Sequence, residues 1–425
     1  MESKIIDLIN PNNSHRIKTL RQMQEYYLKK GYVVYSDKLK IYNFKFIRKI
    51  KVLYKLIFHT KLTFKDPTRR DFIIFDSENT KDIVKILPNN NFKIIPTRVG
   101  SIKELYISKK ILFFIILNFF KRTLKQNYIA GLIKEIDPKL VITHIDNSSD
   151  FYLNAKIFKN KIKFIAVQNA NRGDIVYEPL EETQKVYIPH LFCFSEFDEK
   201  IYKKKKCNIE KFEIVGSLRS SLAAELVKER GININPKKYD ICLVSEPHPV
   251  LNSDYQHIKN YAESVAKIAE YTHRLCKKKN LSLIFTSKRE DELDSCFYKE
   301  YLKNYDFEIL PGSYLVYSTY QNVMQSRMII GHISTILREA IAFNKKILSC
   351  NFTEHPDIIF PTNGLCVLQN VSYELFEERV LKILNMSENE YFDQLKTKKD
   401  FIMKPTIDTA NVIRKKLTSI LQENN

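Results

Sequence analysis

Short apolar runs, each followed directly by a cluster of polar residues, recur along this chain and constrain its fold more than any other feature. The runs 140–143 and 163–167 are examples, and segments with helical spacing of apolar residues separate them. Strands that alternate with helices predict an α/β fold with parallel sheets. Ligands of such sheets bind beyond the carboxyl ends of the strands. We therefore expect one ligand-binding edge in the first half of the chain, formed by the polar clusters at 144–149, 168–174 and 216–221.

The segment 328–349 reads as strand, tight turn, helix and strand. Gly331 ends the first strand, and Ser334 and Thr335 occupy positions typical of the N-cap of the helix that follows. Free backbone N–H groups beside two hydroxyls form a site suited to phosphate. The same two residues are also among the preferred helix caps. Local sequence leaves both interpretations open, and Glu339 lies one helical turn further along the same face.

Composition narrows the class of partner. The formal net charge of +20 favours an anionic partner, namely a phosphate-bearing substrate, nucleic acid or an anionic membrane surface. No zinc-finger spacing or aromatic RNA-binding pattern accompanies the charge, so we predict no nucleic-acid partner. Seven isolated cysteines, with no CxxC pair, indicate reduced core residues. Together with the absence of a signal-peptide pattern, they predict a cytoplasmic protein.

The order of elements divides the chain into three predicted segments. Residues 1–65 form a basic helical segment, 66–230 a first Rossmann-like domain for the acceptor, and 231–425 a second Rossmann-like domain for a nucleotide donor. The last helices are expected to pack back on the first domain. Only nine glycines occur and no GxGxxG motif exists, which excludes hydride transfer with a dinucleotide. No Asp-x-Asp run stands in a clear turn, so we predict neither metal nor cofactor.

Residues 111–120 form an apolar run with two cations on either side, Lys109 and Lys110 before it and Lys121 and Arg122 after it. Ten residues are too few to span a bilayer. The run therefore predicts a buried core helix or an interfacial one. In the second case the cations would contact the anionic inner face of the cytoplasmic membrane.

The order of predicted elements resembles that of the GT-B glycosyltransferases. Among these it is most similar to bacterial surface-carbohydrate enzymes related to polysialyltransferases, Kdo transferases and CDP-glycerol glycerophosphotransferases. The segments that carry the resemblance are 164–170, 213–219 and 331–340. Ala170 and Asn344 stand where those enzymes have glycine. The resemblance implies two Rossmann-like domains that face each other across a cleft. It also implies transfer of a sugar, or a sugar-like or polyol-phosphate unit, from a nucleotide-activated donor to a surface glycan such as capsule or lipopolysaccharide.

The resemblance and the strand-end positions select candidate residues. A general base is expected at the first domain's crevice: Asp146 with His144 behind it, or Glu78 with its neighbour Asp76. Asn169 is a further catalytic candidate, and Gln168 and Arg172 would orient the acceptor or leaving group. The predicted donor-binding residues are Ser334, Thr335, Glu339, His332, Lys288, Arg289, His248, Ser217 and Arg219.

Two other functions fit the same pattern. The first is a nucleotide-sugar 2-epimerase of the same fold, which needs several carboxylates and histidines at one site and no acceptor. The second is a non-catalytic module that binds a glycan or a membrane. For the preferred glycosyltransferase, the expected partners are a nucleotide-sugar donor and a glycan or lipid-linked acceptor.

Overall fold

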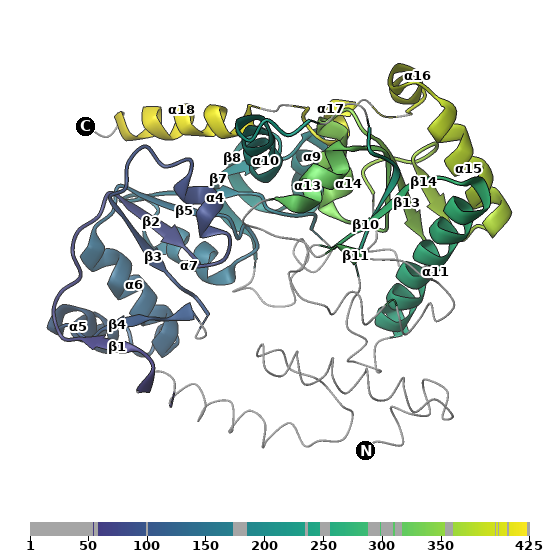
Figure 1. The fold of residues 1–425 in the computed structure, drawn as a ribbon. Helices are drawn as coiled ribbons and strands as arrows, with labels where there is room; N and C mark the ends of the chain where they lie inside the picture. Colours follow the sequence, from purple (N-terminus) through teal and green to yellow (C-terminus); the bar gives the residue numbers. More distant parts are fainter. Residues whose placement is uncertain are drawn as a thin grey trace, which may run out of the picture. The chain divides into compact units, whose positions relative to one another are not determined.

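The described part of the chain is organised around two six-stranded sheets, and all strand pairs described in them are parallel (Figure 1). The computed structural model describes residues 54, 58–98, 101–172, 185–233, 237–246, 256–287, 298, 309–310, 317–352, 360–395, 397, 399–405 and 408–422. Most of the predicted basic segment 1–65 lies outside these residues. Contacts divide the chain into two units. We call them the amino unit, with the described residues up to Leu222 and 408–422, and the carboxy unit, from Ala223 to Pro405.

The amino unit has the strand order β3-β2-β5-β6-β7-β8. Its strands are β2 (Phe72–Phe75), β3 (Phe92–Ile95), β5 (Leu140–Thr143), β6 (Lys163–Val167), β7 (Tyr187–Cys193) and β8 (Asn208–Ile214), with a separate parallel pair of β1 (Lys61–Thr63) and β4 (Glu104–Tyr106). Its helices are α4 (Thr80–Val84), α5 (Lys109–Leu117), α6 (Leu124–Ile136), α7 (Ser149–Ile157), α9 (Glu196–Lys204) and α18 (Thr409–Gln422), and α10 (Leu218–Glu229) leads into the carboxy unit.

The carboxy unit has the order β11-β10-β9-β12-β13-β14. Its strands are β9 (Tyr239–Val244), β10 (Leu283–Thr286), β11 (Ile309–Leu310), β12 (Ser326–Gly331), β13 (Lys346–Asn351) and β14 (Val367–Gln369). Its helices are α11 (Gln256–Lys279), α13 (Ser318–Met324), α14 (Thr335–Ala342), α15 (Tyr373–Asn385), α16 (Glu388–Asp393) and α17 (Lys399–Ile402).

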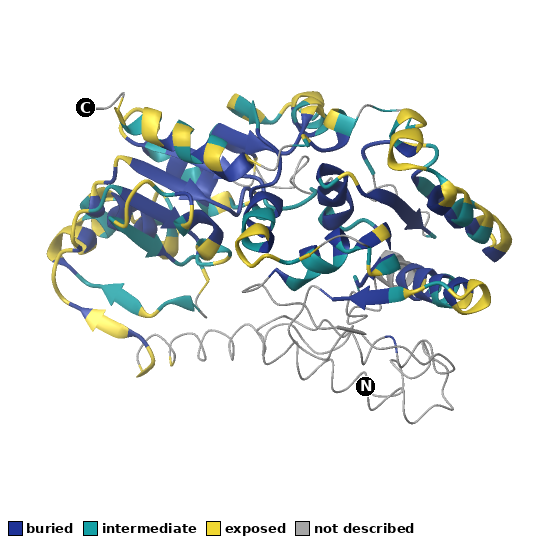
Figure 2. Ribbon diagram, turned by 45° about the horizontal axis from the view of Figure 1, so that its top comes forward, coloured by how far each residue is buried: buried dark blue, intermediate teal, exposed yellow. Residues whose placement is uncertain are grey.

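The central strands of the two sheets are rich in apolar residues, which is why they are buried. All four residues of β2 and of β5 are buried, as expected of parallel strands that are covered on both faces (Figure 2). The strand order reverses direction between β2 and β5 in the amino unit and between β9 and β12 in the carboxy unit. These two switch points are where open α/β sheets bind ligands.

The last helix, α18, packs on the amino unit. Thr409 Oγ1 donates to the carbonyl of Val215 at 2.6 Å, and Ser221 Oγ accepts from the amide of Ala410 at 3.1 Å. Ile413 and Leu417 are fully buried on the inner face of the helix. The chain therefore crosses from one unit to the other within α10 and returns after Pro405.

The cysteines, the length of the helices and the end of α5 bear on three predictions from the sequence. Six cysteines are free among the described residues, and five of them are buried. No described helix combines the length and the apolar character needed to cross a membrane. Helix α5 ends at Leu117, so the apolar run 111–120 is only partly helical.

We expect Ile413→Ala to destabilise the amino unit by about 2–5 kcal/mol, because it leaves a cavity under α18. Urea unfolding followed by far-UV circular dichroism would measure the change. Lys415→Ala, on the exposed face of the same helix, is the matched control and should change stability by less than about 0.5 kcal/mol. Equal effects of the two substitutions would contradict the packing of α18.

Candidate functional site

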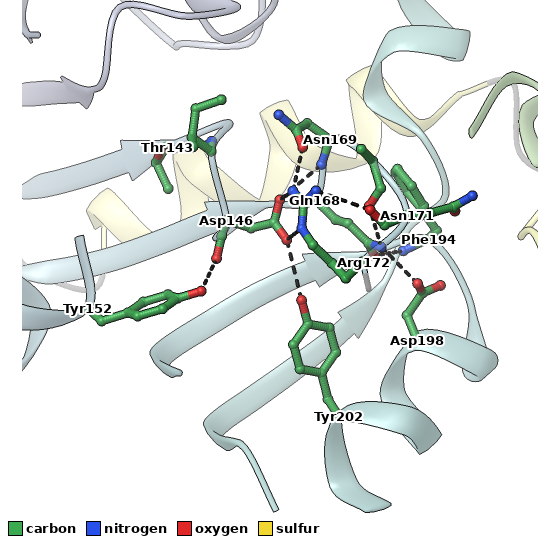
Figure 3. A network of polar contacts seen from close by, with 12 residues as sticks. Thr143, Asp146, Tyr152, Gln168, Asn169, Asn171, Arg172, Phe194, Asp198 and Tyr202 are labelled. Carbon is green, nitrogen blue, oxygen red and sulfur yellow. Dashed lines mark hydrogen bonds and ion pairs between the residues drawn. The ribbon is translucent and has the colours of Figure 1, made fainter. Parts of the chain in front are cut away.

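Asp146 is the centre of a buried polar network at the carboxyl ends of β5 and β6 (Figure 3). Arg172 Nε donates to Asp146 Oδ2 at 2.9 Å, and Arg172 Nη2 contacts Oδ1. The amide of Asn169 donates to the same Oδ1 at 3.2 Å. The pair is a two-pronged guanidinium–carboxylate contact with an added backbone donor, the strongest type of charged hydrogen bond.

Further groups hold this network in place. Tyr202 Oη donates to Asp146 Oδ2 at 3.4 Å, and Tyr152 Oη donates to the Asp146 carbonyl at 2.6 Å. Burial lowers the pKa of Arg172, but the adjacent Asp146 carboxylate outweighs burial and raises this pKa above its usual range. Both carboxylate oxygens of Asp146 are therefore occupied by a permanent cation. Asp146 would have to release Arg172 before it could accept a proton.

Gln168 links the end of β6 to the start of α9. Its Oε1 accepts from the amide of Phe194 at 3.0 Å, and its Nε2 donates to Asp198 Oδ1 at 2.8 Å. Gln168 is almost completely buried, so both ends of its amide serve the fold of the loop that follows β6. In that loop, Ala170 is not among the described residues with positive φ, so alanine in place of the family's glycine causes no backbone strain.

His144 belongs to a second buried cluster at the same sheet edge. Its Nδ1 lies 3.6 Å from Asp82 Oδ2, and Arg219 donates to that oxygen from Nε and Nη2 at 3.2 Å each. Burial, with a smaller contribution from Arg219, lowers the pKa of His144 to about 4. The imidazole is therefore neutral near pH 7. Asp82 was not anticipated from the sequence, where an acidic residue in the first turn of a helix is ordinary.

The alternative acidic pair lies at the β2 end of the same switch point. Asp76 is buried with φ 77°, and its Oδ1 accepts from the amide of Glu78 at 3.0 Å. Thr97 Oγ1 donates to its other oxygen. Glu78 is about half exposed and forms an ion pair with Arg98. Asp76 thus shapes the turn, and Glu78 is the member of the pair that solvent reaches.

Ser217 and Arg219 lie in the amino unit, whereas Ser334, Thr335 and Glu339 lie in the carboxy unit. The predicted donor-binding set is therefore divided between the two units. Ser217 Oγ accepts from the amide of Ser220 at 3.3 Å, in a turn that Gly216 enters with φ 88°. Only glycine adopts that backbone angle without strain.

Ser334 is the N-cap of α14, yet its side chain makes no capping hydrogen bond. Every other Ser or Thr N-cap assigned among the described helices accepts from a backbone amide through its hydroxyl; they are Ser108, Thr123, Ser148, Ser195, Ser372 and Ser387. The ordinary capping interpretation therefore does not apply to Ser334. Its hydroxyl and the first amides of α14 form the kind of group that binds anions.

Glu246 occupies the neighbouring turn at the switch point between β9 and β12. Its Oε2 accepts from the amide of His332 at 2.9 Å and from the amide of Ile333 at 3.1 Å. A carboxylate on two successive amides shows that this turn favours negative charge. The one sequence signal for Glu246 is its position directly after an apolar strand run.

Glu339 is buried, at 4% exposure, so it is not an ordinary surface carboxylate. Tyr320 Oη donates to its Oε2 at 2.8 Å, which fixes the direction of the side chain. His332 is also buried, and burial lowers its pKa to about 4. Asn344, where the family has glycine, takes the left-handed conformation with φ 56°, which asparagine tolerates.

Three predicted donor-binding residues, Lys288, Arg289 and His248, lie outside the described residues. Within the described part of the chain, no group of three or more His, Cys, Asp or Glu side chains is arranged to hold a metal ion. The residues that the structure brings together are thus Asp146 with Asn169 and Arg172, and His144 with Arg219.

Comparison with known structures defines the class of fold. The UDP-GlcNAc 2-epimerase from Neisseria meningitidis bound to UDP-GlcNAc is 14% identical, with 82% of this chain and 99% of that chain covered and a TM-score of 0.51. The S. aureus MnaA–UDP co-structure is 16% identical, with 85% and 97% covered and a TM-score of 0.53. At these identities the likeness concerns the fold. The predicted α/β class, GT-B-like with two Rossmann-like domains, is confirmed.

Part of the sequence is also similar to a described protein family. Residues 165–358, somewhat under half of the chain, match the model of a family described as "putative O-antigen biosynthesis protein". Among curated protein sequences, none matches this chain. The chain therefore has a GT-B-like fold, and residues 165–358 are similar to a family described as acting in O-antigen biosynthesis.

Removal of the Asp146 carboxylate should leave Arg172 charged and buried. We therefore expect Asp146→Ala to cost about 3–5 kcal/mol in the free energy of unfolding. The double variant Asp146→Ala with Arg172→Ala should recover part of that loss in a double-mutant cycle. Urea unfolding of Asp146→Ala, Arg172→Ala and the double variant measures this coupling. Additive effects would show that the two side chains do not interact.

His144, His190 and His332 each have a pKa lowered to about 4, with burial as the main cause. Unfolded histidine titrates near 6.5, so below that pH the unfolded chain binds protons that the folded chain does not. Stability should therefore fall as the pH decreases from about 6.5 toward 4. We expect His144→Gln to remove one of the three contributions, roughly 3 kcal/mol at most. Unfolding free energies at pH 5 and pH 7.5 test this, and an unchanged pH dependence in the variant would contradict it.

Proposed function

We propose that the chain is a nucleotide-sugar-dependent glycosyltransferase of surface-glycan biosynthesis. It would transfer a sugar, or a sugar-like or polyol-phosphate unit, from the donor to a glycan or lipid-linked acceptor without a metal ion. One observation carries the proposal: the uncapped start of α14, with Ser334 and Thr335, lies at a switch point and has the buried Glu339 on the next turn.

The chemistry of transfer explains why these groups suit a donor site. The leaving nucleotide phosphate develops negative charge, and amides that point from a helix N-terminus stabilise such charge without rearrangement. The Ser334 hydroxyl adds a donor that the fold does not use for capping. Glu339, oriented by Tyr320, can accept hydrogen bonds from ribose hydroxyls. Phosphate and ribose are the two parts that all nucleotide donors share.

The acceptor hydroxyl also needs a base. Within the described residues, His144 Nδ1 is buried without a hydrogen-bond partner, whereas both oxygens of Asp146 accept from Arg172. We therefore place His144 before Asp146 as the base and assign Asp146 to the positioning of Asn169 and Arg172. The half-exposed Glu78 is the competing choice. Rates over pH 3–8 for His144→Gln and Glu78→Gln decide between them, since the base variant should lose both rate and the pH limb of that base.

A 2-epimerase is the second candidate, because Asp82, Asp146 and His144 group at one sheet edge, as an epimerase requires. Purified protein with CMP-, UDP-, GDP- and CDP-activated donors separates the two functions. Acceptor-dependent transfer supports the glycosyltransferase, and formation of an epimer without acceptor supports the alternative. If no donor raises the melting temperature or is consumed, both are wrong.

Alanine substitutions test the donor site directly. We expect Ser334→Ala, Thr335→Ala and Glu339→Ala each to weaken binding of the active nucleotide by about tenfold, equivalent to about 1.4 kcal/mol. Ser334→Ala should leave stability nearly unchanged, since the side chain makes no cap bond.

Ser372→Ala is the matched control, because Ser372 is an N-cap in the same unit and its hydroxyl does accept from Leu375 N. It should lose about 1 kcal/mol of stability and retain nucleotide affinity. Isothermal titration and thermal unfolding of the two serine variants give opposite patterns if the assignment is correct. Nucleotide affinity that Ser334→Ala leaves intact would remove Ser334 from the site.

A further inference from the structure

The amino unit exposes an unusual amount of apolar surface around α5. Eleven of the twelve large hydrophobic side chains exposed among the described residues lie between positions 54 and 124. Phe113, Ile116 and Leu117 of α5 are 61–69% exposed, and Phe120 in the following turn is 98% exposed. Scattered exposed apolar residues are normal, whereas a concentration of this kind marks an interaction site.

The exposed residues of α5 share one face. Leu112, Phe113, Ile116 and Leu117 follow the spacing of residues on one side of a helix. The opposite face packs on α6, where a Cβ on Gly131 would lie 3.3 Å from the Phe114 ring. Close contact with α6 thus fixes α5 in the orientation that points the apolar face outward. We call this face, together with Phe119 and Phe120, the α5 face.

Exposed apolar side chains also occur at β1. Leu62 of the strand and Phe64 directly after it are exposed on either side of the buried Thr63. The link between the two elements is direct, because Lys110 at the start of α5 forms a 2.8 Å ion pair with Asp66 just after β1. In Figure 1, α5 lies at the margin of its unit beside β1 and β4.

Cations border the α5 face at both ends. Lys109 and Lys110 begin the helix, and Lys121 and Arg122 follow the turn after it. The segment 109–122 contains no Asp or Glu. A surface that complements it is apolar inside and negatively charged where the polar groups begin.

We propose that the α5 face docks on an anionic phospholipid bilayer. At nine residues α5 is about 14 Å long, less than half of the roughly 30 Å hydrocarbon layer, so it lies along the interface rather than across it. The apolar side chains of the α5 face enter the acyl region, and Lys109, Lys121 and Arg122 meet the lipid phosphates, whereas Lys110 is paired with Asp66. The inference stands on this surface alone and does not depend on the proposed transfer reaction.

Charge argues against the two other occupants of such a face. Lys110 is paired with Asp66 and Glu135, but a symmetric dimer through the α5 face would still bring Lys109, Lys121 and Arg122 of one copy near those of the other, which is repulsive. Residues 1–53 of the chain carry twelve Lys and Arg against four Asp and Glu, so they do not supply the missing negative charge either. Anionic lipid supplies both the apolar interior and the negative rim.

Co-sedimentation of the full chain with vesicles tests the proposal. The protein should bind vesicles of phosphatidylcholine with 30% phosphatidylglycerol and should bind pure phosphatidylcholine much more weakly. The triple variant Phe113→Ser, Ile116→Ser and Leu117→Ser should reduce partitioning by at least about tenfold. Lys109→Glu with Lys121→Glu should reduce it by about fivefold or more for each charge and lessen its salt dependence.

Leu375→Ser is the matched control, since Leu375 is 54% exposed on α15 of the other unit. This variant should bind vesicles as the wild type does. Circular dichroism and thermal unfolding without vesicles check that each variant is folded. Three results would overturn the proposal: no vesicle binding by the wild type, undiminished binding by the folded triple variant, or a wild-type dimer that the triple variant abolishes in the absence of vesicle binding.

Discussion

The parallel direction of the strand pairs in the described sheets is the constraint on which the rest of the structure depends. Because all strands of a sheet point the same way, the residues that follow them gather at one edge, however far apart they lie in the chain. Asp76, His144 and Gln168 reach the same edge of the amino unit in this way. The reversal of strand order then leaves one place at that edge where no crossover helix covers the gap between strands.

Polar groups at such an edge are buried, and burial decides what each can do. A buried charge without a partner is costly, so Asp146 is matched by Arg172 and Asp82 by Arg219. Histidine avoids the cost by losing its proton, which is why His144 is neutral at neutral pH. The sheet edge therefore holds two kinds of polar group. The ion pairs Asp146–Arg172 and Asp82–Arg219 position loops, and the uncharged His144 can still take up a proton.

The sequence predicts the fold because the fold depends on local patterns. Apolar runs such as 140–143 and the turn around Gly331 are visible without knowledge of contacts. The site was predicted only as a set of positions. Asp146 was identified as a candidate, but its partner Arg172 lies 26 residues away, and Asp82 meets Arg219 over a separation of 137 residues. No periodicity encodes such pairs, so a residue expected to act as a base proves to be held by an ion pair.

Places where a local rule fails are informative in a chain that otherwise obeys the rules. Ser334 stands at a helix start without capping it, although six other Ser and Thr residues do cap their helices. Helix α5 turns apolar side chains outward, although its unit buries β2 and β5 completely. Neither departure contributes to folding stability, because a cap bond is forgone in one case and apolar surface is left in water in the other. The two departures lie in different units and concern different chemistry. One is a hydroxyl at a helix N-terminus, which suits a phosphate-bearing donor, and the other is an apolar face between cations, which suits a lipid surface.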